Sequence, residues 1–368
     1  MSNLGVGLIP IGLVGMAAEI YAMVKFYQLW KRFGLVKFLY WVLQFALNCI
    51  LGVCLCRVTL FENEIVKSSL LRVSALYFVF MLYSTVLILL RQLVCVIGKR
   101  YQWKNRCYKF IRSTKRGVGS ILVFSFVISV VALFWAQYRS ETTYVLDGFG
   151  ESMKMTVVSD AHIGTAVLRS DLPEIVEEIQ ATKPDIIFIL GDMFDHNTSE
   201  ALRQATVKAF SKLSAPYGVF YVEGNHEAKF EEDTAGYFRK AGIQVLLDQV
   251  TTLPNGVQIA GRRDFSDEEQ LSLETVLSGT DKERPLILLS HQPQEYKEAE
   301  KLGVDLVVSG HTHGGQFFGN VLTYLGNDMN YGMKKLGNMT AITSSGVGAM
   351  GVPAKLGVPN EVVVVEVK

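Results

Sequence analysis

The sequence predicts an N-terminal four-helix transmembrane region followed by an α/β domain. Hydrophobic residues make up 49% of the 368-residue chain. The mean hydropathy of +0.25 is high for a soluble protein. Long apolar runs are confined to residues 1–138, whereas short apolar and polar segments alternate from Met153 onward. We therefore expect a transmembrane domain over residues 1–138, a linker over 139–152 and a second domain over 153–368.

Four stretches in the N-terminal part are long enough to cross a hydrocarbon core, which takes about 20 apolar residues. They are Leu4–Met23, Leu35–Leu55, Val73–Val96 and Ile121–Tyr138. A cleavable signal peptide fits poorly, because the N-terminus lacks a cationic segment and three further apolar stretches follow. Glu19 and Arg91 are ionisable residues at or near membrane depth and are therefore functional candidates. We favour the simpler explanation that both lie near an interface or inside the helix bundle.

Basic residues in the loops predict how the chain is oriented in the membrane. The third predicted loop carries eight basic residues and no acidic one: Lys99, Arg100, Lys104, Arg106, Lys109, Arg112, Lys115 and Arg116. The first loop, around Lys25–Lys37, is also basic. Because cytoplasmic loops are enriched in Lys and Arg, both termini and the C-terminal domain should be extracytoplasmic. We favour this explanation of the third loop over RNA binding, and the net charge of +1 gives a nucleic-acid partner no support.

Cysteine and histidine lie in different halves of the chain. All five cysteines lie in the N-terminal part and form no metal-like pair with a histidine, so we interpret them as small apolar residues in or near lipid. All six histidines lie in the C-terminal domain: His162, His196, His226, His291, His311 and His313.

The C-terminal domain has the pattern of alternating strands and helices. Helices are predicted at Leu172–Thr182 and Ala201–Leu213. Short apolar runs predict strands at Met155–Ser159, Asp185–Leu190, Tyr217–Val222, Pro285–Leu289, Val304–Val308, Thr340–Thr343 and Val362–Val367. Asn255-Gly256 predicts a hairpin turn between Thr251–Leu253 and Val257–Ala260. Strands this short and apolar are typical of sheets covered on both faces.

Five of these strands end in residues that can bind metal ions. The segments that follow them read SDAH (159–162), GDMFD (191–195), GNHE (224–227), SHQP (290–293) and GHTHGGQ (310–316). Ligands of open α/β sheets bind outside the carboxyl ends of the strands. In an extended segment, residues i and i+2 point the same way, so Asp160 with His162, and His311 with His313, should reach a common centre. The glycines before Asp192, Asn225 and His311 should permit tight backbone turns where each strand becomes a loop.

The candidate ligands are oxygen and nitrogen donors without a thiolate. Such a set suits Mn²⁺, Fe or Zn²⁺, with Mn²⁺ favoured, rather than a structural Cys-zinc site. The ligands are too many for one tetrahedral ion and suit two divalent ions that share a carboxylate.

These motifs, in this order, resemble those of the calcineurin-like metallophosphoesterase superfamily. The Gly261–Asp264 stretch (GRRD), LLSHQP and SGHTHGGQ resemble more closely its membrane-anchored bacterial branch. The resemblance covers Met153 to Lys368. It implies a four-layer α/β/β/α sandwich of two mixed sheets and a metal-dependent phosphoric ester hydrolase.

The resemblance also assigns roles to residues. It implies that the first ion is bound by Asp160, His162 and His313, the second by Asn225, His291 and His311, and both by a bridging Asp192. His226 would be the catalytic histidine, which protonates the leaving-group oxygen or steadies the phosphoryl charge. Glu227 stands where many relatives have Asp.

The motifs and the segments near them contain further candidate residues. We interpret Asp195 and Glu227 as partners that orient ligand imidazoles. Arg263 is a candidate for binding the substrate phosphate, although a loop arginine is more often solvated. His196 matches no ligand position, and a surface or substrate-rim position fits it equally well. The segment Ser344–Gly351 is a candidate for the pocket floor.

The leading hypothesis is a membrane-bound phosphoesterase on the extracytoplasmic face. Its substrate would be a phosphomonoester, phosphodiester or pyrophosphate attached to a lipid or envelope component, and its other partner the lipid bilayer. Only the 21 residues 139–159 separate Tyr138 from Asp160, which keeps the centre close to the membrane. One alternative is a cytoplasmic-face nucleotide-lipid pyrophosphatase, which the basic third loop opposes. Another is a non-catalytic transporter or sensor with a phosphoesterase-like binding domain, although no metal ligand is lost.

Overall fold

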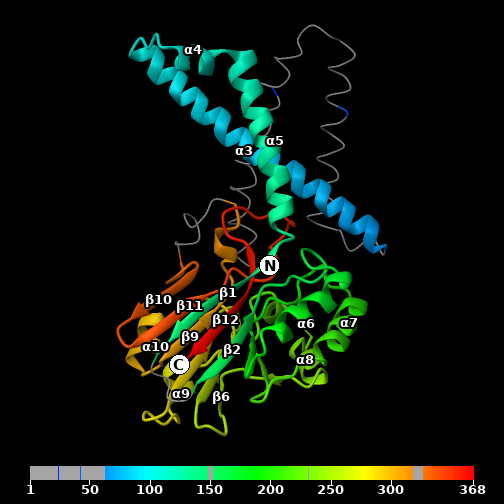
Figure 1. Ribbon diagram of the computed structural model, residues 1–368, viewed down its shortest axis with the longest axis vertical. Coiled ribbons are helices and arrows are strands. Elements are labelled where there is room, and N and C mark those ends of the chain that lie inside the picture. The colour runs from blue at the N-terminus through cyan, green and yellow to red at the C-terminus, as the bar shows by residue number, and fades with distance from the viewer. Residues whose placement is uncertain (1–23, 25–41, 43–62, 148–151, 231, 318–325) are drawn as a thin grey trace. The chain divides into compact units, whose positions relative to one another are not determined.

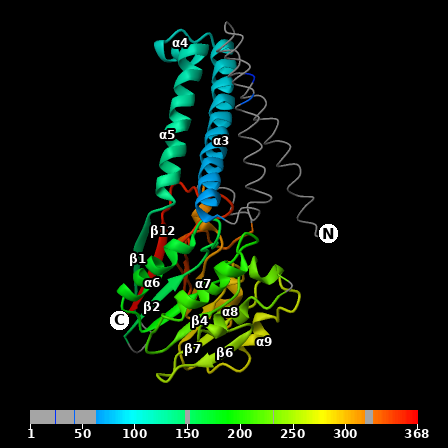
Figure 2. The ribbon, with the colours of Figure 1, turned by 90° about the vertical axis from the view of Figure 1, so that its right-hand side faces the viewer.

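The computed structural model describes residues 24, 42, 63–147, 152–230, 232–317 and 326–368. The chain divides into two compact units, of which one contains Ser69–Phe134 and the other Trp135–Lys368. Figures 1 and 2 show the helices of the first unit and the strands and helices of the second.

The described part of the first unit is helical. Its elements are α3 (Glu64–Arg100), α4 (Arg106–Arg112), a π-helical turn (Thr114–Val118) and α5 (Gly119–Trp135). By length and apolar composition, Val66–Arg100 and Lys115–Trp135 could each cross a membrane. The predicted span Val73–Val96 lies within α3. The predicted span Ile121–Tyr138 overlaps α5, and the two other predicted spans and Glu19 lie outside the described residues.

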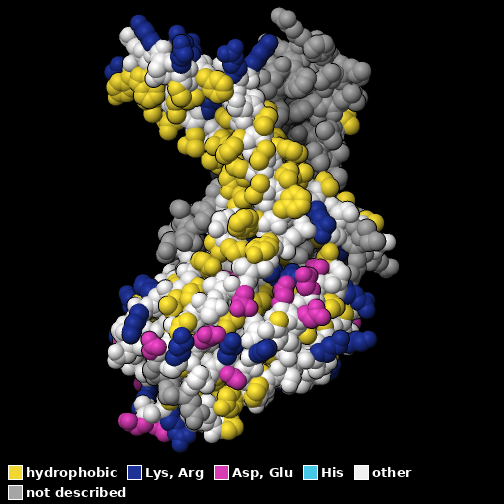
Figure 3. All heavy atoms as spheres, in the orientation of Figure 1, with side chains coloured by type: hydrophobic (Ala, Val, Ile, Leu, Met, Phe, Trp, Pro, Cys, Tyr) yellow, Lys and Arg dark blue, Asp and Glu magenta, His cyan; other side chains and the backbone are white. Residues whose placement is uncertain are grey.

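The surface of these helices is apolar along much of its length. Large side chains such as Leu93, Val96, Val123 and Phe124 are each more than half exposed. Lys and Arg side chains gather around α4, and apolar side chains cover α5 (Figure 3). Arg91 donates hydrogen bonds from Nε and Nη2 to the carbonyl oxygens of Ile111 (2.8 Å) and Arg112 (2.9 Å), which favours a structural role for this arginine.

The second unit contains two six-stranded mixed sheets. The first has the order β1-β12-β2-β3-β4-β5, and the second the order β10-β11-β9-β8-β7-β6. In the first sheet β12 is antiparallel to β2, and in the second β10 and β6 are antiparallel to their neighbours. The strands of the first sheet are β1 (Arg139–Leu146), β2 (Met153–Val158), β3 (Ile186–Ile189), β4 (Val219–Tyr221), β5 (Gln244–Val245) and β12 (Asn360–Val367). Those of the second are β6 (Gln249–Thr252), β7 (Gln258–Gly261), β8 (Leu286–Leu289), β9 (Leu306–Ser309), β10 (Gly332–Leu336) and β11 (Met339–Thr343).

Helices cover the outer face of each sheet. The first sheet packs against α6 (Leu172–Ala181), α7 (Glu200–Phe210) and α8 (Ala235–Lys240), which lie together in Figure 2. The second packs against α9 (Leu273–Leu277) and α10 (Tyr296–Lys301).

The alternation of side chains along β3 explains the layers. Ile187 and Ile189 belong to the hydrophobic core beneath α6, α7 and α8. Ile186 and Phe188 belong to the core between the two sheets, with residues such as Ile287 of β8. Successive side chains of a strand point to opposite faces, so a strand buried on both faces is apolar throughout. The predicted α/β/β/α arrangement of two mixed sheets is therefore confirmed for this unit.

The segment 139–152, expected to be a linker, contains a strand. β1 pairs in parallel with β12, in a register that places Arg139 opposite Asn360 and Leu146 opposite Val367. β12 lies between β1 and β2 (Figure 1). The side chains of β1 alternate between exposed and partly buried, as is typical of an edge strand with one solvated face. Because polar residues interrupt β1, it contains no apolar run from which a strand could be predicted.

Candidate metal centre

The candidate ligands lie at the carboxyl ends of five strands, which belong to both sheets. β2, β3 and β4 of the first sheet lead to Asp160 and His162, to Asp192 and to Asn225. β8 and β9 of the second sheet lead to His291 and to His311 and His313. The predicted edge of strand ends is therefore formed by both sheets, which pack face to face.

The backbone of this centre is not extended. The φ angle is positive at five of the seven candidate ligands: Asp160 (57°), His162 (45°), Asp192 (51°), His311 (72°) and His313 (50°). Left-handed backbone at a residue other than glycine costs about 1–3 kcal/mol and is concentrated at functional sites. The expectation that Asp160 and His162 converge because their segment is extended is therefore wrong. They converge because each adopts a left-handed turn.

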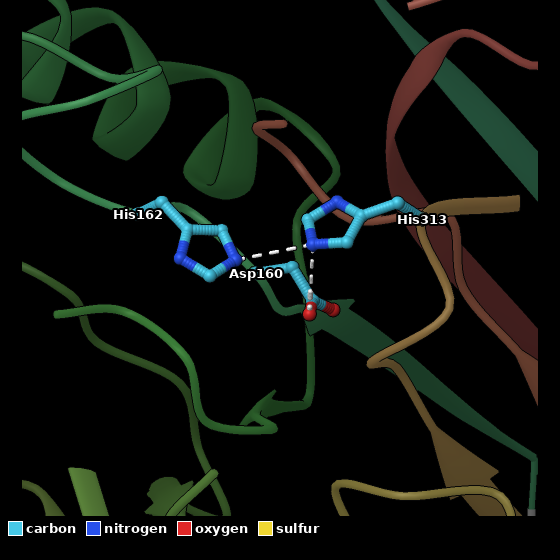
Figure 4. A group of neighbouring side chains, drawn as sticks. All are labelled: Asp160, His162 and His313. Atoms are coloured by element: carbon cyan, nitrogen blue, oxygen red, sulfur yellow. Dashed lines mark hydrogen bonds and ion pairs between the residues drawn. The ribbon is translucent and has the colours of Figure 1, made fainter. Parts of the chain in front are cut away.

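Asp160, His162 and His313 form a first group, whose ligand atoms all lie within 4.8 Å of one another. Nε2 of His313 lies 3.1 Å from Nε2 of His162 and 3.5 Å from Oδ1 of Asp160 (Figure 4). The two rings stack with their centroids 5.0 Å apart, and all three side chains are buried. A carboxylate and two imidazole nitrogens thus point to one place.

A second group consists of Asp192, His291 and His311, whose ligand atoms also all lie within 4.8 Å of one another. Nε2 of His291 lies 3.2 Å from Oδ2 of Asp192. The other ring nitrogen, Nδ1, is 2.6 Å from the carbonyl oxygen of Leu190, to which it donates a hydrogen bond. That bond orients the ring so that Nε2 faces the group, an arrangement common among metal-binding histidines.

Asp192 links the two groups. Its ligand oxygen also lies within 4.8 Å of nitrogens of His162 and His226, and Oδ2 is 3.9 Å from Nε2 of His162. One carboxylate therefore lies within reach of the imidazoles of both groups.

Two buried ligand atoms test whether the residues present fit divalent cations. Among the described residues, Oδ1 of Asn225 has no hydrogen-bond partner, and Nε2 of His291 makes no hydrogen bond although Oδ2 of Asp192 lies 3.2 Å away. A buried polar atom without a hydrogen bond costs about 1–3 kcal/mol, and a cation would satisfy both atoms. The donor set of carboxylate, amide and imidazole also suits divalent transition metals. The residues therefore fit the two ions that the sequence predicted.

The charges of the centre favour metal binding. Burial lowers the pKa of His313 to about 3 and that of His311 to about 4. Both are therefore neutral near pH 7, the form in which imidazole binds metals. Burial acts to raise the pKa of Asp192, but His291 holds it well below its usual range, and Asp192 in turn raises the pKa of His291 against the effect of burial. A cation at this pair would compete with a proton, because imidazole binds metals in its neutral form.

Glu227 supports the loops rather than an imidazole. Oε2 accepts hydrogen bonds from the backbone N–H groups of Asp192 (2.8 Å) and Gly224 (3.1 Å), and Oε1 accepts one from Phe194 (2.9 Å). Burial, followed by the charge of Asp192, raises its pKa to about 8. The prediction that Glu227 orients a ligand imidazole is therefore wrong, whereas Oδ2 of Asp195 does lie 3.8 Å from Nδ1 of His162.

Two glycines allow the close approach of loops in the centre. A Cβ atom on Gly224 would lie 2.3 Å from Oδ1 of Asp192, and one on Gly310 would lie 2.4 Å from Oδ2 of Asp160. Neither has a positive φ, so close approach and not turn geometry requires glycine at these two positions. Gly191, before Asp192, does have the positive φ (77°) of the expected turn.

His226 lies at the rim of the centre. Its backbone N–H donates a hydrogen bond to Oδ1 of Asp192 (2.9 Å), and its Nε2 is 4.0 Å from Oδ2 of the same residue. Its ring meets that of His162 edge to face with the centroids 4.9 Å apart, and its side chain is 25% exposed. Burial lowers its pKa, against the charge of Asp192. Residues 225 and 226 form a turn, so the side chains of Asn225 and His226 need not point to opposite faces as they would on an extended strand.

The remaining candidate residues are held by other contacts or are exposed. Arg262 is buried and bound to Asp248 (2.8 Å) and Glu295 (3.2 Å), which gives it a structural role. The guanidinium of Arg263, the predicted substrate contact, is held 2.6 Å from Asp267. His196 is exposed.

The predicted pocket floor does contact the first group. Within Ser344–Gly351, the carbonyl oxygen of Gly348 lies 3.4 Å from Nδ1 of His313, and Val347 donates its N–H to the carbonyl oxygen of Ser159 (2.9 Å). Sequence reasoning missed two buried charges that hold this segment, Lys355 and Glu361, because no motif surrounds them.

Comparisons with known proteins agree with this centre. Residues 153–315 match the family model described as calcineurin-like phosphoesterase. A relative from Aquifex aeolicus, described as an uncharacterized metallophosphoesterase, is 37% identical over 60% of this chain and 86% of its own length. One from Helicobacter pylori strain J99, with the same description, is 28% identical over 69% of this chain and 72% of its own length. One from Danio rerio, described as a transmembrane protein with metallophosphoesterase domain, is 29% identical over 57% of this chain and 52% of its own length.

The matched residues include β2 to β9, and so contain all seven candidate ligands. The chain therefore belongs to the calcineurin-like metallophosphoesterases, the metal-dependent hydrolases of phosphoric esters.

Proposed function

We propose that the chain hydrolyses a phosphomonoester, phosphodiester or pyrophosphate that is linked to a lipid or envelope component, at the extracytoplasmic face of the membrane. The observation that carries the catalytic part is the position of Asp192, within ligand distance of imidazoles in both groups. A shared carboxylate is what a dinuclear centre requires, whereas a single ion would need only one group.

The ligand assignment follows the two groups. Asp160, His162 and His313 would hold one ion. His291 and His311 would hold the other, together with the unpartnered Oδ1 of Asn225, and Asp192 would contact both. When bound, a pair of divalent ions supplies Lewis acidity that lowers the pKa of a water molecule and neutralises phosphoryl charge. We favour Mn²⁺, which this mixed oxygen and nitrogen set suits.

His226 is the residue best placed to act on the substrate itself. Its ring borders the Asp192 carboxylate, and a quarter of the side chain is open to solvent. From there Nε2 can give a proton to the leaving-group oxygen or donate a hydrogen bond to a phosphoryl oxygen. The bond from the backbone N–H of His226 to Asp192 holds the backbone of this residue beside the centre.

Several observations support the membrane part of the proposal. Two described helices are apolar enough to span a bilayer and expose large side chains along their length. The relative from Danio rerio is described as a transmembrane protein. The eight basic residues of the third predicted loop support a multi-pass chain whose catalytic domain is extracytoplasmic. In the sequence only the 21 residues 139–159 separate the last predicted span from Asp160, which favours a lipid-linked phosphate.

The test is a substrate screen with the full chain in detergent, loaded with Mn²⁺. The panel contains phospholipids, prenyl phosphates and chromogenic diesters, each lipid paired with a soluble analogue that carries the same head group without the acyl or prenyl chain. We expect turnover of at least one lipid at a kcat/KM at least tenfold above that of its soluble analogue, and none with the Asp192→Ala variant. Equal turnover of lipid and analogue would contradict the lipid assignment. No turnover of any substrate would favour a non-catalytic binding domain.

A further inference from the structure

Lys355 is a fully buried lysine that the centre described above does not use. Its exposed fraction is 0%, although it lies in a segment rich in glycine and proline. The ammonium group donates hydrogen bonds to the carbonyl oxygen of Ser345 (2.6 Å) and to Oδ1 of Asn360 (3.1 Å). Burying a charged group is costly unless it is paired and hydrogen-bonded, so these bonds indicate a specific structural role for Lys355.

Ser345, whose carbonyl oxygen accepts the hydrogen bond from Lys355, makes further hydrogen bonds through its own N–H and hydroxyl groups. Ser345 donates its backbone N–H to Oε1 of Glu361 (2.9 Å), and its hydroxyl donates to the carbonyl oxygen of Pro359 (2.6 Å). Glu361 is also fully buried. Two buried charges of opposite sign therefore fix the N–H and the carbonyl group of one residue.

Ser345 begins the segment that lies behind the first ligand group. A Cβ atom on Gly346 would lie 2.6 Å from Cβ of Asp160, so the backbone passes close to this ligand. Further along, the carbonyl oxygen of Gly348 faces Nδ1 of His313 at 3.4 Å, which directs Nε2 of that ring toward Asp160. A shift of Ser345 would therefore be transmitted to both ligands.

The charge of Lys355 also reaches the first group. Burial lowers the pKa of Lys355 to about 7, whereas the charges of Asp160 and Glu361 both act to raise it. By contrast, in the described part of the chain the hydrogen bond and the short ion pair of the His291 ring join it to Leu190 and Asp192, not to the segment that Lys355 holds.

We propose that Lys355 is a positioning residue for the first metal ion: together with Glu361 it fixes Ser345, and so holds the segment 345–348 against Asp160 and His313. It touches neither substrate nor metal. The proposal rests on the ligand assignment given under the proposed function. The binding of two Mn²⁺ ions by the wild-type chain tests that assignment separately, before any variant of Lys355 is made.

The experiment is a calorimetric titration of the demetallated full chain with Mn²⁺ alone. Lys355→Met removes the charge and keeps most of the volume. Because a lone buried Glu361 could prevent folding, the double variant Lys355→Met/Glu361→Gln removes both charges. Lys335→Met, at an exposed position of β10, is the matched control. Circular dichroism and hydrodynamic size establish that each variant is folded.

We expect one of the two Mn²⁺ binding steps to weaken by about 10–100-fold in the folded variants, as is usual when a partner of a metal ligand is lost. The other step should stay within about threefold of wild type, and Lys335→Met should change neither. If the folded double variant binds both ions as wild type does, or loses affinity equally in both steps, Lys355 does not position the first ion. Failure of the wild type to bind two ions would instead contradict the ligand assignment.

Discussion

Nε2 of His291 lies 3.2 Å from Oδ2 of Asp192, and the segment that supplies this carboxylate also orients the imidazole. Leu190, two residues before Asp192, accepts the hydrogen bond from Nδ1 of His291 at 2.6 Å. The end of β3 therefore positions a ligand of its own sheet and one that belongs to the other sheet. A displacement of this strand end would move both ligands together.

The first prediction is that Asp192→Ala loses most of both metal ions. A shared carboxylate contributes to each ion, so its removal should lower the content from close to two ions per chain to well below one. Elemental analysis by mass spectrometry of the purified full chain measures this content. Asp233→Ala, which removes a carboxylate that is 67% exposed, should keep both ions. Retention of two ions after Asp192→Ala would mean that this residue does not bridge.

The second prediction concerns the close approach at Gly310. The Cβ atom of Gly310→Ala would lie 2.4 Å from Oδ2 of Asp160, well below ordinary contact distance, so the carboxylate must move. We expect the variant to bind one ion at least tenfold more weakly. Gly279→Ala is the matched control, because a Cβ atom there has no neighbour within 4 Å among the described residues and the glycine has an ordinary φ. Unchanged Mn²⁺ affinity in folded Gly310→Ala would show that Asp160 does not depend on this approach.

That the ligands converge could be predicted from the sequence, but their backbone conformation could not. Five apolar strands each end in a carboxylate, amide or imidazole, and parallel strands bring such ends to one edge. The left-handed φ angles at Asp160 and His162 depend on long-range hydrogen bonds instead. Asp160 donates its N–H to the carbonyl oxygen of Gly191, and His162 donates to that of Asp192, both at 3.0 Å. No property of the residues between Asp160 and His162 reveals these bonds.

The parts missed by sequence reasoning share a dependence on distant residues. β1 has few apolar residues in a row, and its pairing partner β12 lies more than 200 residues later in the chain. Lys355 and Glu361 look like ordinary charged residues, and only their burial distinguishes them. Glu227 was recognised as part of a motif. Its three backbone N–H partners lie on the loops after β3 and β4, which come together only in the folded domain.

The third prediction concerns membrane topology. Native Cys107 is exposed in the basic loop, and Glu268 is exposed in the catalytic domain, so both positions can be labelled. In a background without other cysteines, a membrane-impermeant maleimide should label Glu268→Cys in intact cells. It should label Cys107 only after the cells are made permeable. The reverse pattern would place the catalytic domain in the cytoplasm and favour the nucleotide-lipid pyrophosphatase.

The last prediction separates catalysis from metal binding, and it depends on how His226 is held. The backbone N–H of this residue, not its ring, bonds to Asp192 at 2.9 Å, so truncation of the side chain leaves that contact intact. The ring nevertheless lies close enough to His162 and Asp192 to serve as a ligand. Metal content therefore has to be measured together with activity.

We expect His226→Ala to keep both metal ions and its fold while turnover falls by about 10²–10⁴, the usual contribution of a positioned acid. His196→Ala, at an exposed position outside both groups, is the control and should retain full activity. If His226 protonates the leaving-group oxygen, the loss should be smaller for a nitrophenyl ester, whose leaving group needs little protonation, than for an alkyl ester. An equal loss for both esters would mean that His226 steadies the phosphoryl group instead. Loss of a metal ion from His226→Ala would mean that His226 is a metal ligand. Full activity of the variant with both esters would mean that His226 takes no part in catalysis, since a group that touches the reacting atoms cannot be deleted without a kinetic effect.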